Sequence, residues 1–81
     1  MTITILFLGP ARDYAGAEEA HLTLGDGATV AQARVALADA FPTLSAALPA
    51  VRFAVNETFV DDDAALADGD ELALIPPVSG G

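Results

Sequence analysis

Residues 72–81 have the sequence LALIPPVSGG, and they predict a strand that stops and continues as a tail. The apolar run 72–75 is typical of a strand. Pro76 ends it, because proline has no N–H to extend a ladder and holds the preceding residue extended. Residues 76–81 can reach about 20 Å beyond the domain, at roughly 3.3–3.6 Å for each extended residue. We expect such a tail to enter a pocket in another protein.

The residues of this tail indicate what the pocket is like. Pro76 and Pro77 stiffen its base, and Gly80 and Gly81 have no Cβ, so they suit a passage too narrow for side chains. The reactive group at the far end is an α-carboxylate. The alternative is a frayed chain end, which is common. Two prolines followed by a terminal glycine pair argue against that alternative.

The composition predicts one small packed domain. The chain has 81 residues, and a hydrophobic fraction of 53% favours a packed domain over a disordered chain. Its apolar runs are too short to span a bilayer, and no basic segment precedes residues 3–8. We therefore expect a cytoplasmic protein that does not bind a membrane.

Charge and missing residue types exclude several kinds of chemistry. The net charge is −9, and the three basic residues are Arg12, Arg34 and Arg52, which argues against binding to nucleic acid. Because cysteine is absent, we expect no disulfide, no thiolate metal site and no cysteine nucleophile. Because lysine is also absent, an activated C-terminus cannot be captured by an ε-amine of the same chain or of a second copy.

Alternating apolar residues predict five strands, at residues 2–9, 18–24, 51–56, 58–60 and 71–75. Gly9 and Pro10 break the first strand, so we predict a loop through Arg12, Asp13, Tyr14 and Gly16. His21 falls on the polar face of its strand, where a solvated imidazole is expected rather than a catalytic one.

One main helix is predicted between the second and third strands. Thr29 and Gln32 fit a capping box, and Pro42 ends the helix. Its apolar stripe consists of Val30, Ala33, Leu37 and Phe41. We expect this stripe to pack on the sheet, and residues 43–49 to form a short helical turn at most.

The acidic segment 61–71 does not fit a calcium site. An EF-hand loop needs oxygen ligands at its first, third and fifth positions, glycine at the sixth and glutamate at the twelfth. No register of this segment satisfies that pattern. We expect a solvated connection with a turn at residues 68–70, and no metal site.

The order of elements predicts an α+β fold. We favour a β-grasp domain over residues 1–75, with a mixed sheet whose first and last strands are parallel and central, and a flexible tail over residues 76–81. One helix covers only one face of such a sheet. The residues predicted to face the helix are Ile3, Ile5, Phe7, Val51, Phe53, Val55, Leu72 and Leu74.

The other face of the predicted sheet is also apolar. It carries Leu8, Phe59, Ala73 and Ile75. An apolar patch that the chain cannot cover usually marks a partner interface, although scattered surface hydrophobes are common. Ile75 lies where the tail departs, and this favours the interface.

Three segments carry a family resemblance: residues 66–81, 6–12 and 54–58 are similar to the molybdopterin synthase small subunit. The resemblance implies a ubiquitin-like β-grasp fold and a sulfur carrier in molybdenum cofactor biosynthesis. It implies a partner resembling ubiquitin-activating enzymes, an adenylyltransferase that uses ATP to adenylate the terminal glycine, and a sulfur donor protein that converts the adenylate to a thiocarboxylate. The sulfur then passes to cyclic pyranopterin monophosphate in the large subunit, within a heterotetramer containing two copies of each subunit.

The resemblance also assigns roles to residues. Gly81 carries the adenylate and then the thiocarboxylate, and Gly80 lies in the channel. The implied contacts with the large subunit are Leu8, Arg12, Phe59, Ile75, Pro76, Pro77, Val78 and Ser79. The chain then supplies no catalytic side chain and binds no cofactor, and Leu8 and Ile75 stand where the family has bulky aromatics.

Three other functions remain open from the sequence. The chain could be a sulfur carrier for thiamine synthesis or transfer-RNA thiolation, a ubiquitin-like protein modifier, or a β-grasp interaction domain with an inert tail. The first two use the same chemistry at the terminal glycine.

Overall fold

The computed structural model describes residues 1–76, so the predictions for Pro77, Val78, Ser79, Gly80 and Gly81 lie outside the described residues. Its elements in chain order are β1 (Thr2–Phe7), α1 (Pro10–Ala15), β2 (Glu19–Thr23), α2 (Val30–Ala40), the 3₁₀ turns η1 (Pro42–Leu44) and η2 (Leu48–Ala50), β3 (Arg52–Val55), β4 (Thr58–Val60) and β5 (Glu71–Ile75). None of these helices is long and apolar enough to cross a membrane.

The five strands form one mixed sheet in the order β2-β1-β5-β3-β4. β1 and β5 are parallel, and every other neighbouring pair is antiparallel. The parallel register sets Thr4 beside Glu71 and Phe7 beside Leu74. The predicted α+β architecture, with its first and last strands parallel and central, is confirmed.

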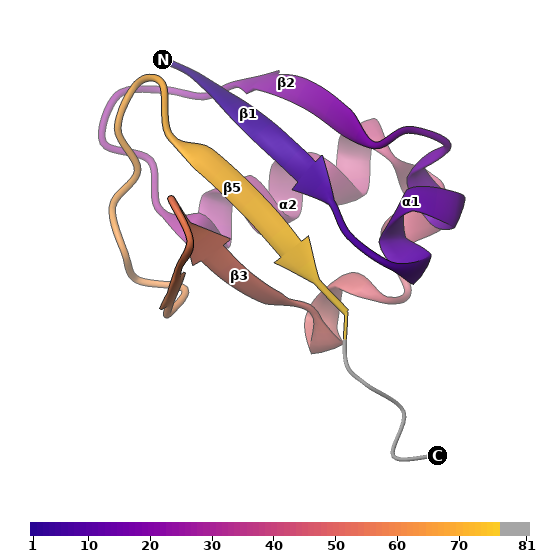
Figure 1. The fold of residues 1–81 in the computed structure, drawn as a ribbon. Helices are drawn as coiled ribbons and strands as arrows, with labels where there is room; N and C mark the ends of the chain where they lie inside the picture. Colours follow the sequence, from indigo (N-terminus) through magenta and orange to yellow (C-terminus); the bar gives the residue numbers. More distant parts are fainter. Residues whose placement is uncertain (77–81) are drawn as a thin grey trace.

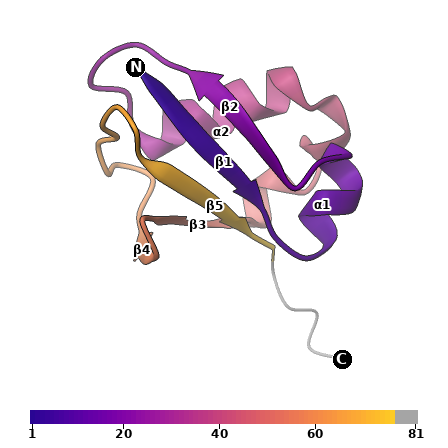
Figure 2. The same cartoon turned by 45° about the horizontal axis from the view of Figure 1, so that its top comes forward.

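Helix α2 covers one face of this sheet (Figure 1 and Figure 2). The side chains beneath it alternate along β1, β3 and β5, as the sequence predicted. The largest fully buried side chains are Phe7, Phe53, Ile3, Ile5, Leu37, Leu44, Leu48, Leu72, Leu74 and Val30. Phe41, at the end of α2, closes this core by packing edge-on against Phe7, with ring centroids 5.1 Å apart.

The predicted capping box fixes the start of α2. The backbone N–H of Gln32 donates to Thr29 Oγ1 at 3.4 Å, and the backbone N–H of Thr29 donates to Gln32 Oε1 at 2.8 Å. Pro42 follows the C-cap residue Phe41 and begins η1. The helix therefore lies where the sequence placed it, and the two 3₁₀ turns fall in the segment expected to be a short helical turn.

The loop predicted through Arg12 and Tyr14 is wrong, because this segment forms helix α1. Pro10 stands at the first helical position, where its fixed φ suits a helix and its missing N–H costs nothing. Gly16 caps the other end at φ 72°, and its N–H donates to the Arg12 carbonyl at 2.9 Å. Ala11 anchors this short helix in the core.

Arg34 connects α2 to the segments that flank β3 and β4. Its guanidinium donates to the carbonyls of Leu48 and Val51, the latter at 3.0 Å. It also binds both carboxylate oxygens of Asp62, at 2.6 and 3.2 Å, and lies 4.6 Å from the centroid of the Phe53 ring. A planar fork of five donors allows one side chain to make all of these contacts.

The hairpin between β3 and β4 turns through Asn56 and Glu57. Their φ angles are 48° and 72°, the left-handed pair that a two-residue type I′ turn requires. Asn56 is well suited to this region, and its side chain accepts from the Glu71 amide at 3.0 Å and donates to Asp70 at 3.1 Å. Glu57 has no such compensation among the described residues, so it carries the backbone strain of the turn.

We predict that Glu57→Gly stabilises the domain. Removing the Cβ from a residue in the left-handed region relieves about 1–2 kcal/mol of backbone strain. The extra conformational freedom of glycine in the unfolded chain offsets about 0.5–1 kcal/mol of this gain. The expected gain is up to about 1 kcal/mol, or several degrees in Tm, measured by thermal and denaturant unfolding. Glu57→Ala is the control: it removes the carboxylate but keeps the Cβ, and should not stabilise. Equal gains from both changes would assign the effect to charge rather than to the backbone.

Candidate functional site

The sheet face opposite α2 is the main candidate site, since no element within residues 1–76 packs over it (Figure 1 and Figure 2). The registers of four strands align apolar residues across this face. The row that crosses β1, β5, β3 and β4 consists of Leu6, Ala73, Ala54 and Phe59. Phe59 is 55% exposed, whereas Ala54 is buried among its neighbours.

A second row lies closer to the end of β5. Arg52 pairs with Ile75, and the Leu8 amide donates to the Leu74 carbonyl at 3.4 Å, which continues the parallel register and brings Leu8 beside Ile75. Leu8 is 43% exposed. We call the apolar members of the two rows the outer patch: Leu6, Leu8, Ala54, Phe59, Ala73 and Ile75. The predicted face assignment of Leu8, Phe59, Ala73 and Ile75 is confirmed.

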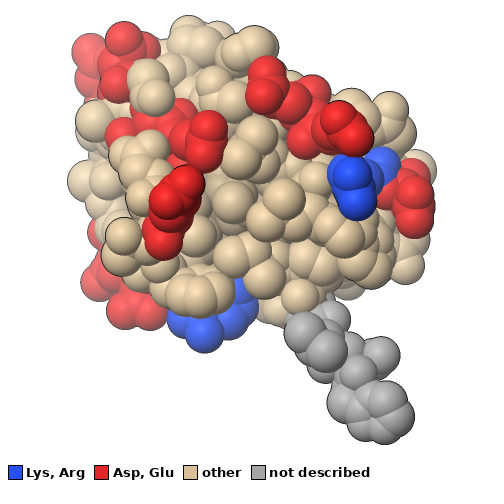
Figure 3. Space-filling view, viewed as in Figure 1, with Lys and Arg blue, Asp and Glu red and all other residues tan. Residues whose placement is uncertain are grey.

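Acidic side chains border much of this apolar surface. Figure 3 shows uncharged atoms over the middle of the face, red carboxylates along its upper and left margins and at its right edge, and blue basic side chains at its lower and right edges. On this face Glu19 pairs across from Leu6, and Glu71 pairs across from Thr4. A partner that covers the outer patch therefore contacts an apolar centre and a largely negative rim.

The base of the tail lies at one end of this patch. The ladder of β5 stops at Ile75, and half-buried Pro76 follows it. Gly9 leaves the neighbouring strand at the same level, with φ 54°, and a Cβ built on it would lie 3.7 Å from Pro76 Cγ. The chain thus leaves β1 at Gly9 and leaves β5 at Pro76 at the same level of the sheet, with these two residues side by side. Pro76 therefore lies at the edge of the outer patch.

The remaining predicted contact residue, Arg12, is not part of the patch. It lies on α1, where its exposed guanidinium donates to Glu18 Oε1 at 3.3 Å. Leu8, Ile75 and Pro76 are thus brought together at the end of β5, Phe59 lies farther along the same face, and Arg12 stands to the side.

Arg52 was missed as a site residue by the sequence reasoning. Its guanidinium carbon lies 4.5 Å from the centroid of the Phe59 ring, on the uncovered face. The signal was present in the sequence. A two-residue turn at Asn56 and Glu57 sets Ala54 opposite Phe59, and this makes Arg52 the diagonal neighbour of the ring.

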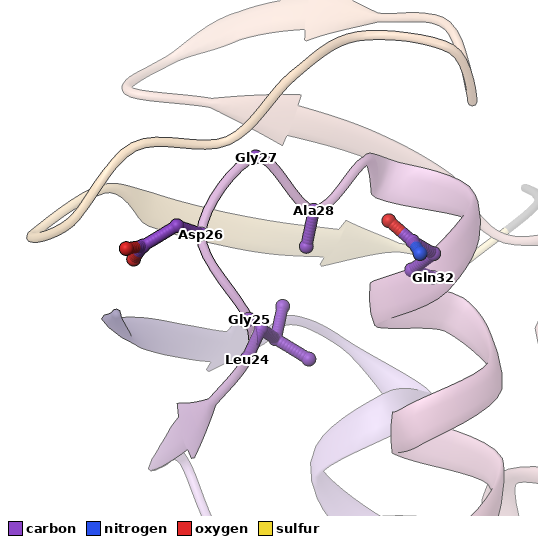
Figure 4. Close-up of a pocket in the computed structure, with 6 residues that line it drawn as sticks. All are labelled: Leu24, Gly25, Asp26, Gly27, Ala28 and Gln32. Carbon is purple, nitrogen blue, oxygen red and sulfur yellow. The ribbon is translucent and has the colours of Figure 1, made fainter.

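The pocket in Figure 4 has little to offer a ligand. It is lined by the loop between β2 and α2 and by Gln32, whose side chain is already used in the capping box. This loop lies beside the start of β1, where the Leu24 amide donates to the Met1 carbonyl, so it is at the opposite end of the sheet from Ile75. Within residues 1–76, no three His, Asp or Glu side chains come close enough to hold a metal ion.

The face assignment predicts opposite outcomes for two phenylalanines. Phe59→Asp should leave the isolated domain folded, because the ring is half exposed and Arg52 offers a counter-charge. Phe53→Asp, the matched control on β3, buries a carboxylate in the core and should unfold the domain or cost more than about 3 kcal/mol. Circular dichroism and urea unfolding measure both. Unfolding by Phe59→Asp would mean that the outer patch belongs to the core.

Comparison with known proteins gives consistent results. Residues 5–81 match the model of the ThiS family. A molybdopterin synthase sulfur carrier subunit from Chlamydomonas reinhardtii is 40% identical, with all of both chains covered. Among solved structures, SAMP1 from Haloferax volcanii has a TM-score of 0.89 and 30% identity, again over all of both chains. A chain in the complex of subunits 1 and 2 of the molybdopterin-converting factor from Helicobacter pylori has a TM-score of 0.73 and 27% identity over the whole of both chains.

Proposed function

The chain belongs to the ThiS family, and we propose that it is the sulfur carrier subunit of a molybdopterin synthase. One observation carries the proposal: the 40% identity to the Chlamydomonas reinhardtii subunit of that name extends over the full length of both chains. The family match also runs through the glycine pair to Gly81. The ubiquitin-like β-grasp fold, with an apolar face beside the base of the tail, suits a protein that docks and presents its terminus.

In this proposal the first step occurs at the α-carboxylate of Gly81. An ionised carboxylate is a poor electrophile and has no adequate leaving group. An adenylyltransferase resembling ubiquitin-activating enzymes joins the carboxylate to the α-phosphate of ATP and releases pyrophosphate. ATP is bound by that enzyme, and this chain contributes the carboxylate alone.

In the second step a sulfur donor protein attacks the acyl adenylate. The terminal sulfur of a persulfide on the donor forms the new carbon–sulfur bond and displaces AMP, which leaves an acyl disulfide. A thiolate then attacks the donor-side sulfur, so the sulfur–sulfur bond breaks, a thiocarboxylate remains on Gly81 and a new disulfide forms on the donor. This group is a soft nucleophile on a tether. The tether brings it to the substrate at a high effective concentration, which free sulfide does not have. Because this chain has no cysteine, its terminus is the place on it where the sulfur can be carried.

Delivery requires docking on the large subunit. We propose that the outer patch is covered there, with Leu8, Phe59 and Ile75 at the contact and Arg12 at its margin. Residues 76–81 then lead Gly80 and Gly81 to cyclic pyranopterin monophosphate, in an assembly with two copies of each subunit. The similarity to a chain of the Helicobacter pylori two-subunit complex supports a partner of this kind. The sulfur acceptor and the acid–base groups belong to the large subunit.

A second candidate function is protein modification. The likeness to SAMP1, described for Haloferax volcanii as a small archaeal modifier protein, favours it. The same adenylate would then be transferred to an amine rather than to sulfur. The two functions differ in their product: a carrier returns to its free form, and a modifier stays attached to its target.

We expect loading to be visible in the intact mass. Incubation with ATP, the adenylyltransferase and the sulfur donor should add the difference between one sulfur and one oxygen, and fragmentation should place it on Gly81. Subsequent addition of the large subunit and pyranopterin substrate should restore the original mass.

The controls follow from the chemistry. Omission of ATP should prevent loading, and so should a tag that blocks the carboxylate of Gly81. Attachment of this chain to lysines of many proteins, without return to the free form, would support the modifier instead.

A methyl group on the last residue should interfere with function but not with folding. Gly81→Ala lies outside the described domain, and we expect an unchanged Tm. Loading or transfer should fall at least about tenfold, because a Cβ must enter a passage suited to glycine. Rates at limiting carrier concentration measure this effect. Wild-type rates for Gly81→Ala would contradict a narrow channel.

A further inference from the structure

We propose that Arg52, held on the ring of Phe59, is a binding residue that receives a carboxylate of the large subunit when the outer patch is covered. This inference rests on the proposed function, because it names a contact of the same docking face. It adds a charged, directional contact to a surface otherwise described by apolar side chains.

The first observation is the pairing of the three arginines. Arg12 is paired with Glu18, and Arg34 is paired with Asp62. Within residues 1–76, Arg52 makes neither an ion pair nor a side-chain hydrogen bond, although the chain carries 12 acidic residues. Among the described residues its N–H donors are therefore left for another acceptor.

The second observation is the contact with Phe59. The guanidinium carbon lies 4.5 Å from the ring centroid, a distance typical of a cation–π contact. The ring restrains the long arginine side chain while its N–H donors remain available to an anion. Less conformational entropy is then lost on binding, because the guanidinium is already held in place.

The third observation is the position of the pair on the sheet. Arg52 pairs with Ile75, the last residue of β5, and Phe59 pairs with buried Ala54. An anion that reaches this guanidinium arrives alongside apolar contacts on both rows. That combination fits an aspartate or glutamate on a protein surface, since a carboxylate accepts two parallel N–H bonds from one guanidinium.

The negative rim sharpens this choice. A chain with net charge −9 repels an acidic partner surface at long range, so a carboxylate is tolerated only where a cation receives it. Arg52 thus fixes the register of docking, because one acidic side chain has one position at which it is neutralised.

The test compares Arg52→Leu with Val35→Glu by calorimetric titration of the large subunit. Both variants change the formal net charge from −9 to −10. Val35 is 65% exposed on α2, on the other side of the domain from the outer patch. A charge-assisted contact is worth about 1.5–3 kcal/mol, so Arg52→Leu should weaken binding at least about tenfold. Val35→Glu should bind with the affinity of the wild type. Both variants should keep a Tm close to that of the wild type.

Two further variants test the geometry. Arg52→Lys keeps the charge but loses the planar fork, and it should recover little of the lost affinity. Phe59→Leu removes the ring face but keeps an apolar side chain. The double variant with Arg52→Leu should lose less affinity than the sum of the two single losses, because the contacts are coupled.

The outcomes separate this inference from the proposed function. If wild type and Arg52→Leu bind and deliver sulfur equally well, the Arg52 contact is excluded and the carrier function stands. Equal losses from Arg52→Leu and Val35→Glu would replace the contact by a general charge effect, and full recovery with Arg52→Lys would exclude the ring-held fork. If the wild type neither binds the large subunit nor delivers sulfur, both proposals fail.

Discussion

One helix can cover only one face of a five-stranded sheet, and most of this molecule follows from that limit. Under α2 the side chains of β1, β3 and β5 are apolar, and all but the partly buried Val55 are buried. On the opposite face an ordinary sheet would present polar residues to water. Here Leu8 and Phe59 are exposed instead, around a nearly buried Ala54, so the second face has the character of an interface.

The central position of β5 connects this face to the tail. A strand at the edge of the sheet would release the chain away from the patch. β5 lies between β1 and β3, so Ile75 ends its ladder beside Leu8 on one side and Arg52 on the other. Pro76 then prevents further pairing. The same strand therefore supplies the centre of the core, the edge of the outer patch and the start of the tail.

Local patterns in the sequence predicted the features that depend on local physics. The alternation along β1 and β5 assigned the two faces, and Thr29 with Gln32 marked the start of α2. Helix α1 was missed because Pro10 was taken as a breaker, although proline is also favoured at the first position of a helix.

Other features depend on contacts between distant segments. Arg34 binds carbonyl groups 14 and 17 residues away and a carboxylate 28 residues away, which no local pattern reveals. The contact between Arg52 and Phe59 lies between these two cases. It can be predicted from the sequence once the turn between β3 and β4 is known to have two residues, because that length sets the register of the two strands. The glycine pair could be assigned a role from the family resemblance, and its geometry belongs to residues outside those described.

The parallel pairing of β1 with β5 also affects how the protein is made. β1 is the first strand to leave the ribosome and β5 is the last of the five, yet each borders the other in the finished sheet. At about 5–20 residues per second, β1 waits several seconds with only β2 as a partner. Pairings this distant in sequence also close slowly. The core is therefore completed only after β5 has emerged, because β5 lies between β1 and β3 in the finished sheet.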